Sequence, residues 1–134
     1  KSGKIVFKAR KIARRSSPTK WVGGLPGRHS LTNAQTRQWY VDNVQAIGQR
    51  IDTSLPLRDQ ALQAFQMRTE VRQMARDFMS DRALADSLPP MRSLQDVVRR
   101  KYQGRDLVGD DLWRDVIRSA QTPDPNVNAL FGIE

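Results

Sequence analysis

The sequence predicts a mainly α-helical protein: a single domain of about four to five helices at residues 21–134, preceded by a basic N-terminal arm at residues 1–20 that could contain a β-strand. Two observations predict this fold class. Apolar residues recur at alternating three- and four-residue spacing through much of residues 32–120, which is the period of a helix with one buried face. Clusters of glycine and proline separate these stretches. At 134 residues the chain is long enough to bury one core.

The N-terminal arm contains one candidate strand. Residues 4–10 concentrate β-branched and aromatic side chains, which favours a short strand. Residues 16–19 are typical of a loop. Between residues 21 and 27, three glycines and a proline exclude regular structure, but such a segment can bring backbone N–H groups close to a ligand.

The first helix is expected to begin near residues 30–32. Thr32 followed by Gln35 matches a capping box, and Ser30 is a competing cap. The helix would bury one apolar stripe. The stripe consists of Tyr40, Val44, Ile47 and Ile51.

The second helix is the longest one predicted, at about residues 56–80. Pro56 suits its first turn, because the N–H that proline lacks is not needed there. One face of this helix is apolar. That face consists of Leu57, Ala61, Ala64, Val71, Ala75 and Phe78. Arg68 interrupts the stripe.

A third helix is expected to follow a break at Pro89-Pro90. Ser93 would cap it, Leu94, Val97 and Val98 would be its apolar residues, and it would stop near Gly104.

A fourth helix would open at Asp110 or Asp111 and carry Leu112, Trp113, Val116, Ile117 and Ala120. Asp124 and Pro125 match an N-cap and a proline in the first helical position, so a last short helix would start there and end at Gly132.

The positive charge is concentrated at the N-terminus. The chain has a net charge of +9, and residues 1–40 contain ten basic side chains and no acidic one. Residues 41–134 contain thirteen basic and fourteen acidic side chains. This asymmetry predicts an electrostatic site for a polyanion, with nucleic acid first and an acidic protein second. The alternative is a solvated basic arm without a ligand.

Other composition features exclude several classes of site. The chain has no cysteine and one histidine, which excludes disulfides, cysteine-based metal sites and multi-histidine metal sites. No apolar run is long enough to span a bilayer. Aspartates at residues 106–115 could suggest Mg²⁺, but two of them are natural helix caps and their spacing matches no specific loop. We therefore predict no metal and no cofactor.

The histidine lies where the glycine-rich segment meets the first helix. A helix N-terminus suits a phosphate, Lys20 and Arg28 could add charge, and His29 could act as acid or base near neutral pH. The alternative is that His29 is an ordinary residue before the helix cap. Trp39 is the better candidate for stacking on a base, because Tyr40 belongs to the apolar stripe.

Arg68 is the second candidate site residue. An arginine on an apolar helix face is costly unless it is paired or solvated. It could stabilise the charge of a phosphorane-like transition state, with Glu70, Arg72 and Asp77 nearby on the helix. The alternatives are a buried ion pair with an aspartate from another helix, or a side chain that reaches solvent at the edge of the stripe.

Three segments resemble the C-terminal toxin domains of bacterial polymorphic toxins of the contact-dependent inhibition or Rhs type. They are Trp21-Val22-Gly23-Gly24-Leu25-Pro26-Gly27-Arg28-His29-Ser30-Leu31-Thr32-Asn33-Ala34-Gln35 with Arg37-Gln38-Trp39-Tyr40, the helix from Ala64 to Asp81, and the ending Val127-Asn128-Ala129-Leu130-Phe131-Gly132-Ile133-Glu134. The resemblance covers roughly residues 20–134. One helical toxin type of this kind carries an HxxD motif, whereas Thr32 stands three residues after His29 here.

The resemblance implies a nuclease, most often of RNA and commonly of tRNA. For this chain a metal-independent ribonuclease is favoured. It would be presented at the cell surface or secreted as part of a larger protein, act in the target-cell cytoplasm and be neutralised by a cognate immunity protein. The basic charge predicts that this partner is acidic, and the domain would otherwise be monomeric. The expected catalytic residues are His29 and Arg68, with weaker support for Thr32, Gln35 and Glu70. The expected nucleic-acid-binding residues are Lys11, Arg14, Arg15, Lys20, Arg28, Trp39 and Arg72.

Two other functions stay open at this point. A metal-dependent DNase would need convergent carboxylates, for which Glu70, Asp77 and Asp81 are the helix-borne group. A non-catalytic nucleic-acid- or protein-binding module would need only the basic arm.

Overall fold

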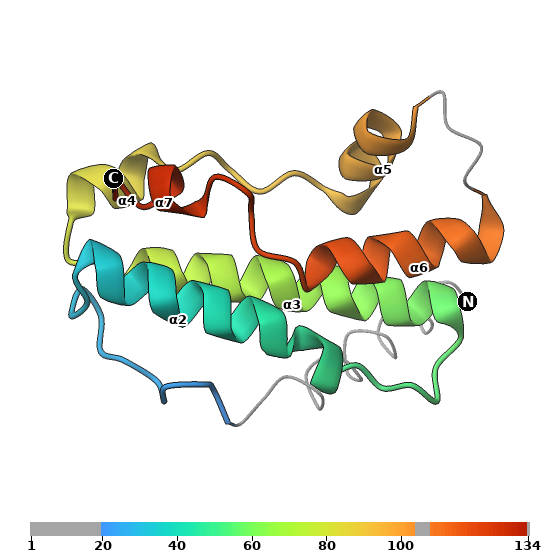
Figure 1. Cartoon of the computed structure of the whole chain (residues 1–134), viewed down its shortest axis with the longest axis horizontal. Coiled ribbons are helices and arrows are strands. Elements are labelled where there is room, and N and C mark those ends of the chain that lie inside the picture. Colours follow the sequence, from blue (N-terminus) through green and yellow to red (C-terminus); the bar gives the residue numbers. More distant parts are fainter. Residues whose placement is uncertain (1–19, 104–107, 134) are drawn as a thin grey trace, which may run out of the picture.

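A computed structural model of the chain describes residues 20–103 and 108–133, and it confirms a mainly helical fold (Figure 1). These residues form six α-helices and one 3-10 helix. They are α2 (Asn33–Gln45), η1 (Ala46–Gln49), α3 (Leu57–Phe78), α4 (Arg82–Ser87), α5 (Leu94–Tyr102), α6 (Gly109–Ala120) and α7 (Val127–Leu130). The candidate strand at residues 4–10 and the basic residues Lys11, Arg14 and Arg15 lie outside the described residues.

The start of α2 follows the predicted capping box. The Thr32 hydroxyl accepts a hydrogen bond from the Gln35 backbone N–H at 3.1 Å, and the Gln35 side chain accepts one from the Thr32 N–H at 2.9 Å. The helix ends earlier than the apolar stripe does. The chain continues as the 3-10 helix η1, in which Ile47 is buried. Ile51 follows η1 and packs against the same core cluster as Ile47.

α3 is the central element, with α2 and α6 packed against it (Figure 1). Its bounds agree with the predicted 56–80 within two residues at each end. Five of its six predicted apolar positions are buried, the exception being half-buried Leu57. α3 ends beside the start of α2, where Leu31 and Met79 form a parallel bridge, the one β-bridge among the described residues.

The chain after α3 forms a short helix that the sequence did not predict. The Asp81 carboxylate caps α4 by accepting a hydrogen bond from the Leu84 N–H at 3.0 Å. An extended segment through Pro89 and Pro90 then leads to α5. As predicted, α5 is capped by Ser93. It packs against α6 and the start of α3 through a cluster formed by Ala61, Leu94, Val98, Tyr102, Leu112, Trp113, Val116 and Ile117.

Two predicted helix starts were wrong in detail. α6 begins at Gly109, so Asp110 and Asp111 lie in its first turn rather than at its cap. α7 begins after Asn126, not at Asp124. The Asp124 carboxylate does not cap a helix because it bonds to side chains of α2 and α3 instead. Over the described ranges, no helix combines the length and apolarity that a bilayer crossing requires.

Candidate functional site

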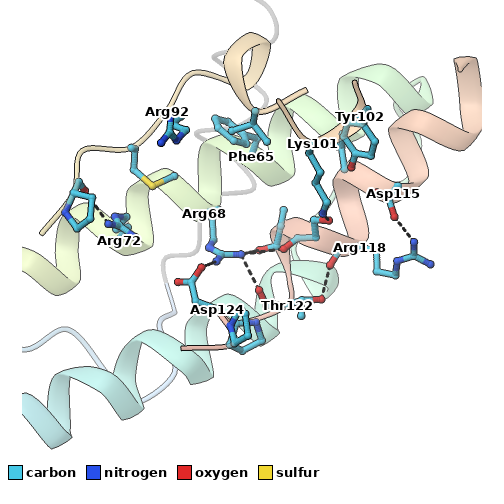
Figure 2. Close-up of a pocket in the computed structure, with 18 of the residues that line it drawn as sticks. Phe65, Arg68, Arg72, Arg92, Lys101, Tyr102, Asp115, Arg118, Thr122 and Asp124 are labelled. Carbon is cyan, nitrogen blue, oxygen red and sulfur yellow. Dashed lines mark hydrogen bonds and ion pairs between the residues drawn. The ribbon is translucent and has the colours of Figure 1, made fainter. Parts of the chain in front are cut away.

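A pocket of about 790 Å³ opens between α3, α5 and α6 (Figure 2). The segment between α4 and α5 and the segment between α6 and α7 complete its walls. Five of its side chains carry a positive charge, and they come from four different parts of the chain. They are Arg68, Arg72, Arg92, Lys101 and Arg118. Asp115 and Asp124 are the two acidic side chains in the lining, so the pocket carries an excess of positive charge.

The guanidinium group of Arg68 is bound by backbone carbonyl groups and by a carboxylate of the protein. Its Nη1 donates to the carbonyl oxygens of Ser119, Ala120 and Thr122 at 3.0, 3.1 and 2.9 Å, and its Nη2 forms an ion pair with Asp124 at 3.0 Å. Only 12% of its side chain is exposed. Of the alternatives that the sequence left open, the ion pair with an aspartate is the one that the structure contains, although Asp124 lies between helices rather than on one.

Tyr40 extends this network to α2. Its hydroxyl donates to Asp124 Oδ2 at 2.9 Å and accepts from Arg68 Nε at 3.2 Å. Burial raises the pKa of the Tyr40 hydroxyl, against the opposing effect of the Arg68 charge. The three side chains therefore join α2, α3 and the segment after α6, and Arg68 and Asp124 form part of the pocket floor.

In the described part of the chain, Arg72 and Lys101 are the pocket cations whose hydrogen bonds all go to neutral oxygens. Arg72 Nη2 donates to the Pro89 carbonyl oxygen at 2.8 Å, and Lys101 Nζ donates to the Ser119 hydroxyl. No carboxylate of the described residues forms an ion pair with either. Their charges are therefore left to act on a ligand.

Asp115 lies near Lys101 on the α6 wall of the pocket. Its carboxylate forms an ion pair with Arg118, and 11% of its side chain is exposed. The nearby Tyr102 hydroxyl lowers the pKa of Asp115, and Arg118 and Lys101 lower it further, while burial opposes them. Asp115 is therefore ionised at neutral pH.

Part of the pocket wall is apolar. Phe65, Met91 and Val97 line it, together with prolines from both flanking segments. Within the described ranges, these three side chains belong to none of the core clusters. Phe65 shares one face of α3 with Arg68 and Arg72, because positions 65, 68 and 72 are spaced by three and four residues.

Beyond the rim of the pocket, α5 carries a ridge of arginines. Asp96 is the acidic partner of Arg99 and Arg100 on this helix, at 2.6 and 3.7 Å, and also of Arg92, which precedes α5 and lines the pocket, at 3.4 Å. Arg99 and Arg100 are 74% and 62% exposed. One carboxylate cannot neutralise three guanidinium groups, so this edge of the molecule is positive.

The structure does not bring His29 and Arg68 together. The His29 N–H donates to the Asp77 carbonyl oxygen at 2.9 Å, near the end of α3. Asp77 lies nine residues after Arg68, or about 13 Å along the helix axis. His29 is exposed and does not line the pocket, and its backbone adopts a left-handed φ of 57°.

Other predicted site residues also lie away from the pocket. The side chains of Thr32 and Gln35 form the capping box. Glu70, Lys20 and Arg28 are exposed and do not line the pocket, whereas Arg72 does.

The prediction that Trp39 stacks on a base was wrong, because the side chain is part of the core. Trp39 is only 5% exposed, and its Nε1 donates to the Gly24 carbonyl oxygen at 3.1 Å. Its ring meets Phe78 edge-on with the centroids 4.9 Å apart. The glycine-rich loop covers Trp39, which leaves no face of the ring for a ligand.

Sequence reasoning missed most of the pocket. Phe65, Arg92, Lys101, Tyr102 and Arg118 were not predicted as site residues. The dense cations at the end of α5 were a visible signal, but their position opposite α6 depends on tertiary packing. No group of three His, Cys, Asp or Glu side chains suited to a metal ion occurs within residues 20–103 and 108–133, and so Glu70, Asp77 and Asp81 do not form one there.

Comparison with known proteins supplies no relative from which a function could be transferred. No family model matches the chain, and neither a curated protein nor a solved structure matches it.

Proposed function

We propose that this domain is an RNA-cleaving toxin domain whose pocket holds the phosphate backbone of its substrate. The observation that carries the proposal is the convergence of five cationic side chains on one pocket that contains two carboxylates. One of those carboxylates, Asp124, is bound by Arg68, and the other, Asp115, by Arg118. Arg72 and Lys101 remain for a phosphate group.

The charge around the pocket suits a long polyanion rather than a small anion. The arginine ridge of α5 continues the positive surface beyond the rim through Arg99 and Arg100. The first forty residues of the sequence add ten basic side chains without an acidic one. Each phosphate that such a surface neutralises releases counterions, which supports affinity for nucleic acid.

The pocket also offers the groups that RNA cleavage requires. In this reaction the ribose 2′-oxygen attacks phosphorus, the bond to the 5′-oxygen breaks, and a 2′,3′-cyclic phosphate forms. We assign Asp115 to accept the 2′-hydroxyl proton and Lys101 to donate a proton to the leaving 5′-oxygen. Arg72 and Arg118 would stabilise the charge that develops on the phosphate oxygens.

The biological setting follows from the resemblance to polymorphic toxin domains. The domain would be delivered as part of a larger secreted or surface-presented protein, and it would cleave RNA, with tRNA as the foremost substrate, in the cytoplasm of a target bacterium. An acidic immunity protein would neutralise it in the producing cell. The charge of the pocket supports an acidic partner, because such a protein would compete with RNA for the same cations.

Inducible expression of the domain in bacteria tests the proposal. We expect growth to stop and total RNA to fragment while chromosomal DNA stays intact. The double variant Arg72→Ala/Lys101→Ala and the single variant Asp115→Asn should restore growth. The control Arg58→Ala/Arg114→Ala removes two cations that do not line the pocket, and it should remain toxic. Sustained growth with intact RNA in the wild type would reject the proposal.

A non-catalytic RNA-binding module is the second candidate. It is favoured by the position of the chain's only histidine, which lies outside the pocket. Purified domain incubated with total RNA distinguishes the two functions. A shift of the RNA on a native gel without new fragments on a denaturing gel would support the binding module.

A further inference from the structure

We infer that the pocket takes a single unpaired nucleotide, with its base against Phe65 and its phosphate on Arg72 and Lys101. The substrate would therefore be single-stranded or looped RNA rather than a duplex. This inference rests on the proposed function, because it names the substrate class of the same site.

The pocket combines two kinds of surface. Arg72 and Lys101 supply charge without acidic partners in the described part of the chain, whereas Phe65, Met91 and Val97 supply apolar area that no core cluster uses. A simple phosphate site would need only the cations. A flat aromatic base attached to a phosphate would use both surfaces.

The aromatic and the cationic side chains reach the pocket from neighbouring elements. Phe65 comes from the same face of α3 as Arg72, and Lys101 extends into the pocket from α5 toward Ser119 of α6 (Figure 2). The aromatic ring and the two cations thus belong to walls of one pocket. A volume of about 790 Å³ lies within the usual range for sites that enclose a small organic ligand.

Paired RNA does not suit this pocket. Bases in an A-form duplex are stacked inside the helix, and the deep, narrow major groove does not admit side chains. A concave pocket can reach a base only when the base is already unstacked or is turned out of the helix. Stacking of an unpaired base on an aromatic side chain is tolerant of base identity. Exclusion of the duplex is therefore a stronger expectation than a preference for one base.

The arginine ridge explains why the ligand would be a strand rather than a free nucleotide. Arg92 and Lys101 line the pocket, while Arg99 and Arg100 lie on α5 outside it. A strand with one nucleotide in the pocket could place its neighbouring phosphates along this helix. A free nucleotide would gain nothing from these exposed arginines.

Fluorescence anisotropy with a labelled oligoribonucleotide of about 8 nucleotides tests the inference. Its riboses are 2′-O-methylated so that it cannot be cleaved. The same oligonucleotide annealed to its complement, a nucleoside monophosphate and polyglutamate serve as the other ligands. We expect the single strand to bind at least ten-fold more tightly than the duplex, and neither the monophosphate nor polyglutamate to compete at comparable concentration. Equal affinity for single strand and duplex, or equal competition by either small or acidic ligand, would overturn the inference.

Variants of Phe65 identify the base contact. Phe65→Ala should weaken single-strand binding by roughly 5- to 100-fold, the usual effect of losing one aromatic stack. Phe65→Leu keeps an apolar side chain without the ring and should lose most of the same affinity, whereas Phe65→Trp should retain it. Thermal unfolding of each variant checks that it folds. Unchanged affinity in folded Phe65→Ala would also overturn the inference.

The two proposals fail differently. If the single strand and the duplex bind equally and both lose affinity in Arg72→Ala/Lys101→Ala, the unpaired nucleotide is rejected but the RNA site stands. If that double variant binds RNA as the wild type does, the pocket is not the RNA site and the proposed function itself is rejected.

Discussion

Arg68 and Asp124 form an ion pair, with Nη2 and Oδ1 3.0 Å apart, that fixes the segment after α6 to the middle of α3. The guanidinium of Arg68 also binds three backbone carbonyl oxygens of that segment. Those carbonyls lie at and beyond the C-terminus of α6, where a helix leaves its last carbonyl groups without partners. Arg68 thus donates hydrogen bonds to the carbonyl groups at the end of α6 and also forms part of the pocket floor.

Replacement of Arg68 by alanine should therefore destabilise the fold. It removes the ion-pair partner of Asp124 and one hydrogen bond from each of the three carbonyl groups, and we expect the free energy of unfolding to fall by about 2–4 kcal/mol. Urea unfolding followed by circular dichroism measures this loss. Arg76→Ala is the matched control, because Arg76 is on the same helix and pairs with Asp86 at 3.7 Å with both side chains exposed. The control should lose less than about 1 kcal/mol, and equal losses in the two variants would contradict the structural role of Arg68.

Asp115 predicts a specific dependence of stability on pH. The Tyr102 hydroxyl and the nearby cations lower the pKa of Asp115 in the folded state. A carboxyl group with a lowered folded-state pKa adds stability above its unfolded value, near 3.9, and this contribution is lost as the pH falls through the folded value. The difference in unfolding free energy between wild type and Asp115→Asn should thus be constant from about pH 5 to 7 and shrink below about pH 4.

Urea unfolding at a series of pH values measures this difference. Asp111→Asn removes a carboxylate from the first turn of the same helix, where the Asp111 side chain is 74% exposed, and it should change stability less than Asp115→Asn at neutral pH. A difference for Asp115→Asn that grows on acidification would contradict the assigned contacts.

The sequence predicted the helices where the local pattern is complete. Thr32 and Gln35 lie close enough to bond to each other, so the start of α2 could be identified from four residues. α3 is 22 residues long, so the helical period of its apolar residues is evident in the sequence. α4 was missed because a six-residue helix shows less than two turns of any period.

The candidate site could not be predicted in the same way, because its residues meet only through tertiary packing. Asp124 followed by Pro125 has the pattern of a helix start, yet Arg68, more than fifty positions earlier, binds its carboxylate. Helical periodicity predicted that Tyr40 is buried and that Trp39 is exposed. The loop at Gly24 buries Trp39 as well, and no local pattern in the helix indicates that loop. Lys101 becomes a pocket residue only once α5 packs on α6.

The unpaired cations of the pocket predict the salt dependence of RNA binding. If Arg72 and Lys101 each contact a phosphate of a single strand, the slope of log affinity against log salt should become less steep by about 0.7 for each residue replaced by alanine. Affinity for an uncleavable single-stranded oligonucleotide, measured at several salt concentrations, gives this slope. Arg58→Ala, whose side chain does not line the pocket, should keep the wild-type slope. A slope that stays the same in Arg72→Ala/Lys101→Ala would show that the phosphates lie elsewhere.

His29 has a left-handed φ of 57°, which is unfavourable for any residue with a Cβ atom. Glycine adopts this conformation without that cost, so His29→Gly should be more stable than His29→Ala by about 0.5–1 kcal/mol, even though glycine loses more entropy on folding. Equal stabilities in urea unfolding would contradict the backbone conformation. Both variants should bind RNA as the wild type does, because His29 lies outside the pocket. Their cleavage rates then separate the two candidate positions of proton transfer: loss of cleavage with intact binding would assign it to His29, and retained cleavage would assign it to Asp115 and Lys101 in the pocket.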